Sequence, residues 1–382
     1  MKLTAFFILL GGFFIKAQQP SYIHFTGNNG LPSNTVYYCI QDLNGYFWFT
    51  TDKGVAKFNG YSFQNFSTND GLSDNDIFDA YEDWQGRIWF SCSNGELSYY
   101  ENGNFYNRSK SPLLSKINTS NLGLKVLSDN KKTIHYITQG LTVSIDSSLK
   151  IKQKKLIGQF ANSTLLKNNL GDVISLNYDT SNVHFTNLTS GTQLSFLNDN
   201  RKIMPRVNTK ADVSEGAVYY STENKVIKKS FSGNRYEVLG EFESMVQYLK
   251  ISDQNKLYIG TQKGLVIYDL LTHKRGKTLF PEPSISSILI DNENHLWITT
   301  LNDGIYLLLN EDVMLITKSN GLAFDKTLYL NFADSNTLFA GSNNFYCSFI
   351  SETGLINMKL PFEKGNGTVS YTHLTLPTNR EV

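Results

Sequence analysis

The residue types that bind metals or transfer protons are present in this sequence, but they are scattered. The six histidines stand at His24, His135, His184, His273, His295 and His373. None of them has a second histidine or a cysteine at the short spacing that metal sites use. His295 comes just before an apolar strand pattern, so we expect it to be a solvated turn residue. The sequence therefore predicts neither a metal site nor a cofactor.

Paired acidic residues could act as general acid and base. Glu82 and Asp83 are adjacent, and Asp74 lies two residues before Asp76, but both pairs fall where turns are expected. A turn or capping role is therefore favoured, and no loop carries the spaced acidic ligands of a dedicated calcium site. The sequence also has no glycine-rich phosphate loop, serine nucleophile motif or phosphorylatable histidine motif. We predict that the chain is not an enzyme and has no catalytic, cofactor-binding or metal-binding residues.

Tryptophan side chains could stack on a sugar. Trp48, Trp89 and Trp297 occupy the same place in similar stretches of sequence, which favours a repeated position in the core over a binding site. Trp84 breaks that rule because it falls in an expected turn. It is the one tryptophan that we consider as an exposed contact, although local packing remains the favoured interpretation.

The tryptophan positions follow an internal repeat. Gly30, Gly45, Trp48 and Gly54 have counterparts 41 residues later at Gly71, Gly86, Trp89 and Gly95, with no gap. Within the first copy, apolar patterns predict strands over Val36–Gln41, 46–50, 55–58 and 62–66, with tight turns at Asn-Gly and Lys-Gly. Four short strands in about 40 residues are typical of a β-propeller blade.

Looser copies continue to the end of the repeat region. Their central residues form the series Trp48, Trp89, Tyr136, Ile174, Tyr219, Tyr258, Trp297 and Phe339. We therefore predict an all-β fold, a β-propeller with seven four-stranded blades over residues 20–318. Residues 319–368 would then be the first blade of a second propeller. One ring of eight units is the alternative.

The closure of the ring is ambiguous in the sequence. Residues 22–26 match the end of the first copy and predict an outer strand that has no blade before it. Pairing with the far end of the chain would close a ring. However, residues 314–317 also have the pattern of an outer strand for the unit of Trp297, and we expect them to fill that position.

The first 17 residues predict a signal peptide. Lys2 precedes an apolar run over residues 3–15, and Ala17 supplies a small residue for cleavage. A retained membrane anchor is the alternative, but the run is shorter than the roughly 20 residues of a membrane-spanning helix.

The three cysteines, Cys39, Cys92 and Cys347, fall in apolar patterns, and buried free thiols are favoured over a Cys39–Cys92 pair. The net charge of +1 argues against nucleic acid as a partner.

The repeat itself points to a family. The copies 30–60 and 71–100, with Gly-Leu-Pro-Ser-Asn and Asp-Leu-Asn-Gly-Tyr-Phe-Trp-Phe in the first, resemble the two-component regulator propeller repeat. In that family, the repeats form the extracytoplasmic sensor of a membrane histidine kinase. The resemblance implies a periplasmic domain that binds a ligand, such as an oligosaccharide, or a protein partner. It further implies that the domain signals to a kinase missing from this sequence, and homodimerisation is a further option.

The same resemblance implies a full-length parent in the inner membrane, which this chain would contact only through a missing C-terminal part. Residues 369–382 break the repeat abruptly, and we interpret them as a non-native tail. A secreted binding or scaffold propeller is the alternative function, and a propeller lyase or glycosidase is less favoured. For a ligand site, we consider the Gly-Leu loops at 26–34, 69–76 and 319–325 on one axial face.

Overall fold

The computed structural model describes residues 20–118, 122–155, 164–178, 182–197, 211–214, 216–231, 236–310, 313, 316–318, 321–324, 326–342, 346–351 and 354–359. The predicted signal peptide over 1–17 and the predicted non-native tail over 369–382 lie outside these residues. Contacts divide the chain into two units, one of them Pro20–Val313 and the other including Met314–Val382. All the sheets are antiparallel and four-stranded, as the repeat predicts.

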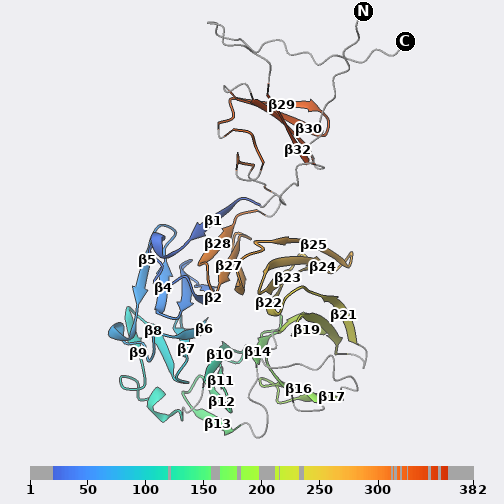
Figure 1. The fold of residues 1–382 in the computed structure, drawn as a ribbon. Coiled ribbons are helices and arrows are strands. Elements are labelled where there is room, and N and C mark those ends of the chain that lie inside the picture. The colour runs from blue at the N-terminus through green and yellow to red at the C-terminus, as the bar shows by residue number, and fades with distance from the viewer. Residues whose placement is uncertain are drawn as a thin grey trace, which may run out of the picture. The chain divides into compact units, whose positions relative to one another are not determined.

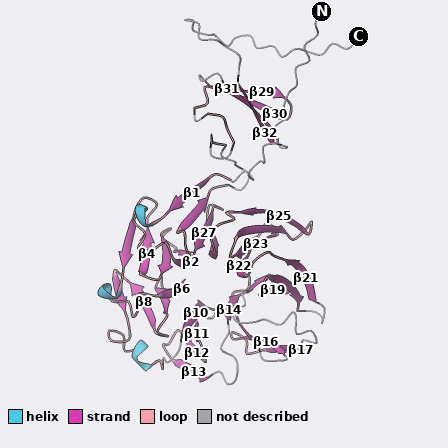
Figure 2. Cartoon of the chain, in the orientation of Figure 1, coloured by secondary structure: helices cyan, strands magenta, loops and turns pink. Residues whose placement is uncertain are grey.

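The first unit contains seven sheets, or blades, arranged around a central axis (Figures 1 and 2). The first three blades along the chain are β2–β5 (Val36–Gln41, Phe47–Thr51, Gly54–Phe58, Phe63–Phe66), β6–β9 (Ile77–Glu82, Ile88–Cys92, Leu97–Glu101, Asn104–Tyr106) and β10–β13 (Gly123–Ser128, Ile134–Thr138, Leu141–Ile145, Ile151–Lys155). The strands predicted for the first copy are confirmed to within one residue.

The next three blades repeat the arrangement. They are β14–β17 (Thr164–Lys167, Val173–Tyr178, Asn182–Asn187, Gln193–Leu197), β18–β21 (Ala211–Ser214, Ala217–Thr222, Lys225–Ser230, Tyr236–Glu241) and β22–β25 (Val246–Ile251, Lys256–Thr261, Gly264–Asp269, Lys274–Leu279). Short 3-10 helices η1 (Gly27–Asn29), η2 (Thr68–Asp70) and η3 (Leu114–Lys116) lie in the loops. The residues of the predicted series all fall on the second strand of a sheet.

The last blade is built from both ends of the unit. Strands β26 (Ile285–Ile290), β27 (Leu296–Thr300) and β28 (Ile305–Leu308) are joined by β1 (Tyr22–Phe25) as the outer strand. Tyr22 pairs with Leu308 and Phe25 with Ile305. The prediction that residues 314–317 fill this position is wrong, because the N-terminal strand already occupies the free edge of β28. Closing the ring in this way removes an exposed edge.

The ring is continuous at its centre. The first strand of each blade contacts the first strand of the next, in the order β2, β6, β10, β14, β18, β22, β26 and back to β2. The sheet β29–β32 (Tyr329–Asp334, Thr337–Gly341, Tyr346–Ser351, Gly354–Lys359) belongs to the second unit.

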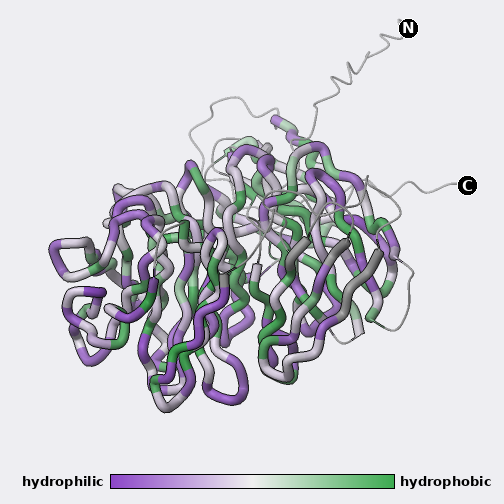
Figure 3. Tube along the Cα trace, turned by 90° about the horizontal axis from the view of Figure 1, so that it is seen from below, coloured by the Kyte–Doolittle hydropathy of each residue, from purple (hydrophilic) through white to green (hydrophobic). Residues whose placement is uncertain are grey.

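The apolar core lies between neighbouring blades. Trp48 on β3 is fully buried against Ile77 and Phe90 of the next blade, and Trp297 on β27 packs on Phe47 and Phe49 of the first. Hydrophobic residues follow the strands, whereas many of the turns at the ends of the blades are hydrophilic (Figure 3). The expected core role of the tryptophans is confirmed.

Candidate functional site

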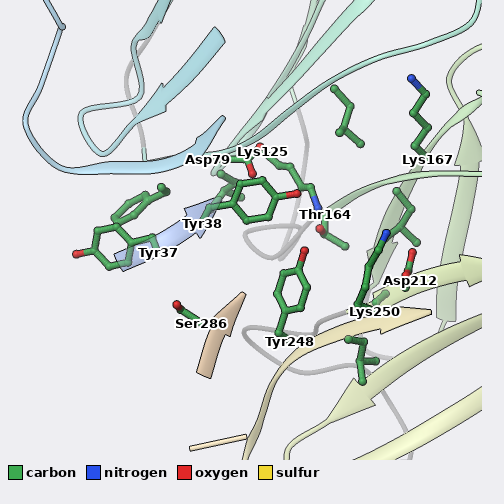
Figure 4. Close-up of a pocket in the computed structure, with 16 residues that line it drawn as sticks. Tyr37, Tyr38, Asp79, Lys125, Thr164, Lys167, Asp212, Tyr248, Lys250 and Ser286 are labelled. Atoms are coloured by element: carbon green, nitrogen blue, oxygen red, sulfur yellow. The ribbon is translucent and has the colours of Figure 1, made fainter. Parts of the chain in front are cut away.

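The first strands of the blades surround a cavity on the propeller axis. It has a volume of about 310 Å³, and its lining includes residues of β2, β6, β10, β14, β18, β22 and β26 (Figure 4). Because each blade contributes side chains from its innermost strand, the cavity exists only when the ring is assembled. The lining residues are Tyr37, Tyr38, Phe78, Asp79, Leu124, Lys125, Leu127, Thr164, Leu166, Lys167, Ala211, Asp212, Tyr248, Leu249, Lys250 and Ser286.

A β-bulge recurs near the start of five inner strands. In each case the pairing register skips one residue, and these residues are Tyr37, Phe78, Leu124, Gln247 and Ser286. A bulge leaves one residue unpaired, bends the strand and redirects a side chain. All of these residues except Gln247 line the cavity. The repeated bulge therefore sets which side chains face the axis.

Two tyrosines project into the cavity from different blades (Figure 4). The ring centroids of Tyr38 on β2 and Tyr248 on β22 are 6.3 Å apart. Burial raises the pKa of both hydroxyls, and the nearby carboxylate of Asp79 raises the pKa of Tyr38 further. Both phenols are therefore neutral near pH 7 and can donate hydrogen bonds.

Five charged side chains complete the lining, and the lysines outnumber the aspartates. The ammonium groups are those of Lys125, Lys167 and Lys250, and the carboxylates are those of Asp79 and Asp212. The Nζ atom of Lys125 lies 5.8 Å from the ring centroid of Tyr38, and that of Lys167 donates to the Tyr81 hydroxyl at 2.7 Å. The lining thus carries one more positive than negative charge.

The two carboxylates hold neighbouring blades together. Asp79 Oδ2 on β6 accepts the backbone N–H of Val126 on β10 at 2.9 Å. Asp212 Oδ2 on β18 accepts a hydrogen bond from the backbone N–H of Ile251 on β22 at 2.8 Å. Asp212 Oδ1 accepts one from the backbone N–H of Val213 at 2.9 Å. These aspartates therefore satisfy backbone donors at the seams of the ring.

One of the loops considered from the sequence reaches the edge of the cavity. Asp76, at the end of loop 69–76, interacts with Tyr37, which lines the cavity: burial and the nearby Asp76 carboxylate raise the pKa of the Tyr37 hydroxyl. Burial raises the pKa of Asp76, and its interaction with Tyr37 opposes the rise. No residue of loop 26–34 lines the cavity, and residues 319, 320 and 325 of the third loop lie outside the described part of the chain.

The histidines considered from the sequence do not line this cavity. His24 Nε2 contacts the Asp303 carbonyl oxygen at 2.6 Å, and His295 Nδ1 contacts Asp291 Oδ2 at 3.2 Å within its turn. His373 lies outside the described residues. Among the residues that the structure describes, no cluster of three histidine, cysteine or acidic side chains could hold a metal ion.

Trp84 and the cysteines have structural roles. Trp84 is partly buried against the core between the second and third blades, with the Arg87 guanidinium 6.0 Å from its ring. Cys39, Cys92 and Cys347 are buried and free, which confirms the prediction for the thiols. The residues that sequence reasoning missed are those on the inner strands, above all Tyr38, Lys125 and Tyr248.

Similar folds occur among solved structures. The extracellular domain of BT3049 from B. thetaiotaomicron, described as a hybrid two-component system, matches with a TM-score of 0.65 and 17% identity over 88% of this chain and 49% of that one. The extracellular domain of BT4673 from the same organism matches with a TM-score of 0.60 and 15% identity over 90% of this chain and 47% of that one. This chain thus spans about half the length of either domain.

Virginiamycin B lyase from Staphylococcus aureus also matches, with a TM-score of 0.60 and 12% identity over 78% of this chain and 99% of that one. At these identities, the likeness shows the fold. The β-propeller is confirmed, and the neighbours from two-component systems agree with the family that the repeat resembles. No family model and no curated protein matches the sequence. Within the described residues, no helix is long and apolar enough to cross a membrane.

Proposed function

We propose that this chain is part of the periplasmic sensor of a two-component histidine kinase. In this proposal, the propeller binds a ligand or partner, and the signal passes to a kinase domain encoded outside this sequence. The observation that carries the proposal is the axial cavity, whose walls come from the inner strands of successive blades. A ligand held there contacts several blades at once, so binding can change how the blades pack.

The comparisons support the sensory role, although lyases are also among the similar folds. The extracellular domains of BT3049 and BT4673 share the fold across most of this chain. For the virginiamycin B lyase, a histidine-to-alanine variant is described as catalytically inactive. Among the described residues, no histidine lines the axial cavity, so a histidine-dependent lyase reaction has no support at this site.

The gene of the source organism provides the first test. Its sequence beyond the codon of residue 368 is expected to continue into further repeats, a membrane helix and a histidine kinase. A stop codon soon after this point would contradict the proposal, and a secreted binding or scaffold propeller would then be the better account. Mass spectrometry of the exported protein is a second test, since a signal peptide over residues 1–17 predicts a mature chain that begins after Ala17.

A further inference from the structure

The charges of the axial cavity indicate what kind of ligand it accepts. Among the described residues, no carboxylate lies within 4.0 Å of the ammonium groups of Lys125, Lys167 or Lys250. The carboxylates of Asp79 and Asp212 instead accept backbone N–H groups across the blade seams. The cavity thus presents positive charge that no described side chain neutralises by direct pairing.

The uncharged polar groups of the lining also favour an anion. The hydroxyls of Tyr38 and Tyr248 are protonated near pH 7, as tyrosines normally are, and burial raises their pKa further, so they are available as donors. Thr164 adds a third hydroxyl to the lining that Lys125 and Lys250 share (Figure 4). Charge-assisted hydrogen bonds from such donors to an oxyanion are stronger than bonds between neutral groups.

The size and the aromatic walls limit the ligand further. A volume of about 310 Å³ is at the small end of the range for small-molecule sites, about 300–1,000 Å³. The rings of Tyr37, Tyr38, Phe78 and Tyr248 provide flat apolar surfaces around the donors. A hydrated inorganic ion would leave these rings unused, and a volume of about 310 Å³ is too small to enclose a long polymer.

We propose that the axial cavity binds a small organic carboxylate, with its charge between Lys125 and Lys250 and its carbon skeleton against Tyr38 and Tyr248. This inference rests on the proposed sensory function for its biological role and gives the chemical class of the ligand. A cation is disfavoured because it would face the lysines, while the two aspartates already serve as acceptors. A neutral ligand would leave the lysine charges without a partner.

Calorimetric titration of the full chain tests the proposal with matched pairs of probes. Glucuronate is compared with glucose, and benzoate with benzamide, at low ionic strength. At least one acid is expected to bind about tenfold or more tightly than its neutral counterpart, as one charge-assisted contact predicts. Binding should weaken as salt is added, because ions screen the lysines. Equal affinity within both pairs, or no binding of either acid, would overturn the proposal.

Variants locate the binding. Lys125→Met and Lys250→Met keep the alkyl chains and should each weaken binding of the acid about tenfold or more. Lys125→Arg should retain most of the affinity, and thermal unfolding verifies that each variant is folded. Lys274→Met, on the exposed outer strand β25, is the matched control and should bind as the unaltered chain does. Unchanged affinity in both methionine variants at Lys125 and Lys250 would overturn the assignment to this cavity.

A third arm separates organic from inorganic anions. Sulfate should bind more weakly than the preferred organic acid, because it makes no use of the tyrosine rings, and tighter binding of sulfate would overturn the organic part of the proposal. Failure of the carboxylate proposal can be distinguished from failure of the sensory proposal. A gene that stops after residue 368 would leave acid binding intact, whereas loss of acid binding would leave the kinase connection standing with another ligand.

Discussion

The indole Nε1 of Trp48 donates a hydrogen bond of 2.8 Å to Oδ2 of Asp42. The other carboxylate oxygen of Asp42 accepts the backbone N–H groups of Asn44 and Tyr46, at 3.0 and 2.9 Å, and so closes the turn between β2 and β3. One buried aspartate therefore fixes a turn and satisfies the only polar atom of a fully buried tryptophan. Asp83 with Trp89 and Asp291 with Trp297 repeat the pair at 2.7 and 2.9 Å.

Replacement of Asp42 by alanine should lower the free energy of unfolding substantially. The substitution leaves a buried indole N–H and the turn N–H groups without an acceptor, and each unpaired buried donor costs about 1–3 kcal/mol. Ser252→Ala is the matched control. Ser252 occupies the same turn position in the blade of Tyr258, where its hydroxyl accepts only a backbone N–H at 3.3 Å. Denaturant unfolding measures both, and an equal loss in the two variants would contradict the role of the Asp42–Trp48 bond.

The third blade carries a histidine where the first, second and last blades have tryptophan. His135 Nε2 contacts Asp129 Oδ2 at 3.1 Å, and His135 pairs with Leu127 as Trp48 pairs with Ile40. The predicted central residue of this copy, Tyr136, is therefore one position too late. The spacing from the turn aspartate identifies the correct position, because Asp129 precedes His135 by six residues, as Asp42 precedes Trp48.

We expect this histidine to make stability depend on pH. Burial lowers the pKa of His135, and hydrogen bonding to Asp129 only partly opposes it. Below the unfolded pKa of about 6.5, the unfolded chain binds more protons at this site than the folded chain, so the free energy of unfolding falls by up to about 1.4 kcal/mol per pH unit. This decline in the free energy of unfolding ends below the pKa that His135 has in the folded chain. Asp129, whose pKa the hydrogen bonds from His135 and Thr133 lower despite burial, adds a loss only at more acidic pH.

Unfolding curves between pH 4.5 and 7.5 measure this effect. The variant His135→Asn should lose part of the decline in stability below pH 6.5, although it is less stable at neutral pH. His273→Asn is the control, because the side chain of His273 is 54% exposed. The same pH slope in His135→Asn as in the unaltered chain would show that other groups cause the decline.

The closure of the ring by β1 can be tested at a glycine. Gly304 has a φ of +74°, and a Cβ atom there would lie 2.2 Å from the carbonyl oxygen of Phe25 on β1. Gly54 makes the equivalent approach to Phe66 in the first blade, at 2.0 Å. Gly103→Ala is the matched control, since Gly103 has a φ of +84° and open space around it. Left-handed backbone alone costs about 1–2 kcal/mol in alanine.

Gly304→Ala should therefore destabilise the chain more than Gly103→Ala, because it also displaces the closing strand. Limited proteolysis between β1 and β2 should become faster only in Gly304→Ala. Equal stability of the two variants would argue against tight packing of β1 on the last blade.

The sequence predicts the blades well because their turns and core repeat with the same spacing. Gly45, Trp48 and Gly54 recur as a unit, and each has one physical reason for its position. The cavity follows a different rule. Tyr38, Asp79, Lys125 and Tyr248 take equivalent places in the register, directly after the bulge. Tyrosine, aspartate and lysine all occur at this place because the side chains face the axial cavity and not the repeated core between blades, so no repeat reveals them.

The same distinction explains the ambiguity over closure. Residues 22–26 and 314–317 carry similar outer-strand patterns, because an outer strand needs only a few apolar side chains on one face. Pairing with β28 selects between the two, and this long-range contact leaves no separate mark in the sequence. The outer strand of the last blade could therefore not be assigned from pattern alone.

Finally, the buried thiols should be unreactive in the folded chain. Burial raises the pKa of Cys39 and of Cys92 to about 12, and the thiolate is the form that reacts with alkylating reagents. Incubation with iodoacetamide at pH 8 should leave both thiols unmodified by mass spectrometry, whereas unfolding in guanidinium should expose them to complete alkylation. A cysteine introduced at the exposed Ser62 is the control and should react in the native protein. Rapid native labelling would mean that a seam of the ring opens readily, because Cys39 packs in the core between the first and last blades and Cys92 in the core between the first and second.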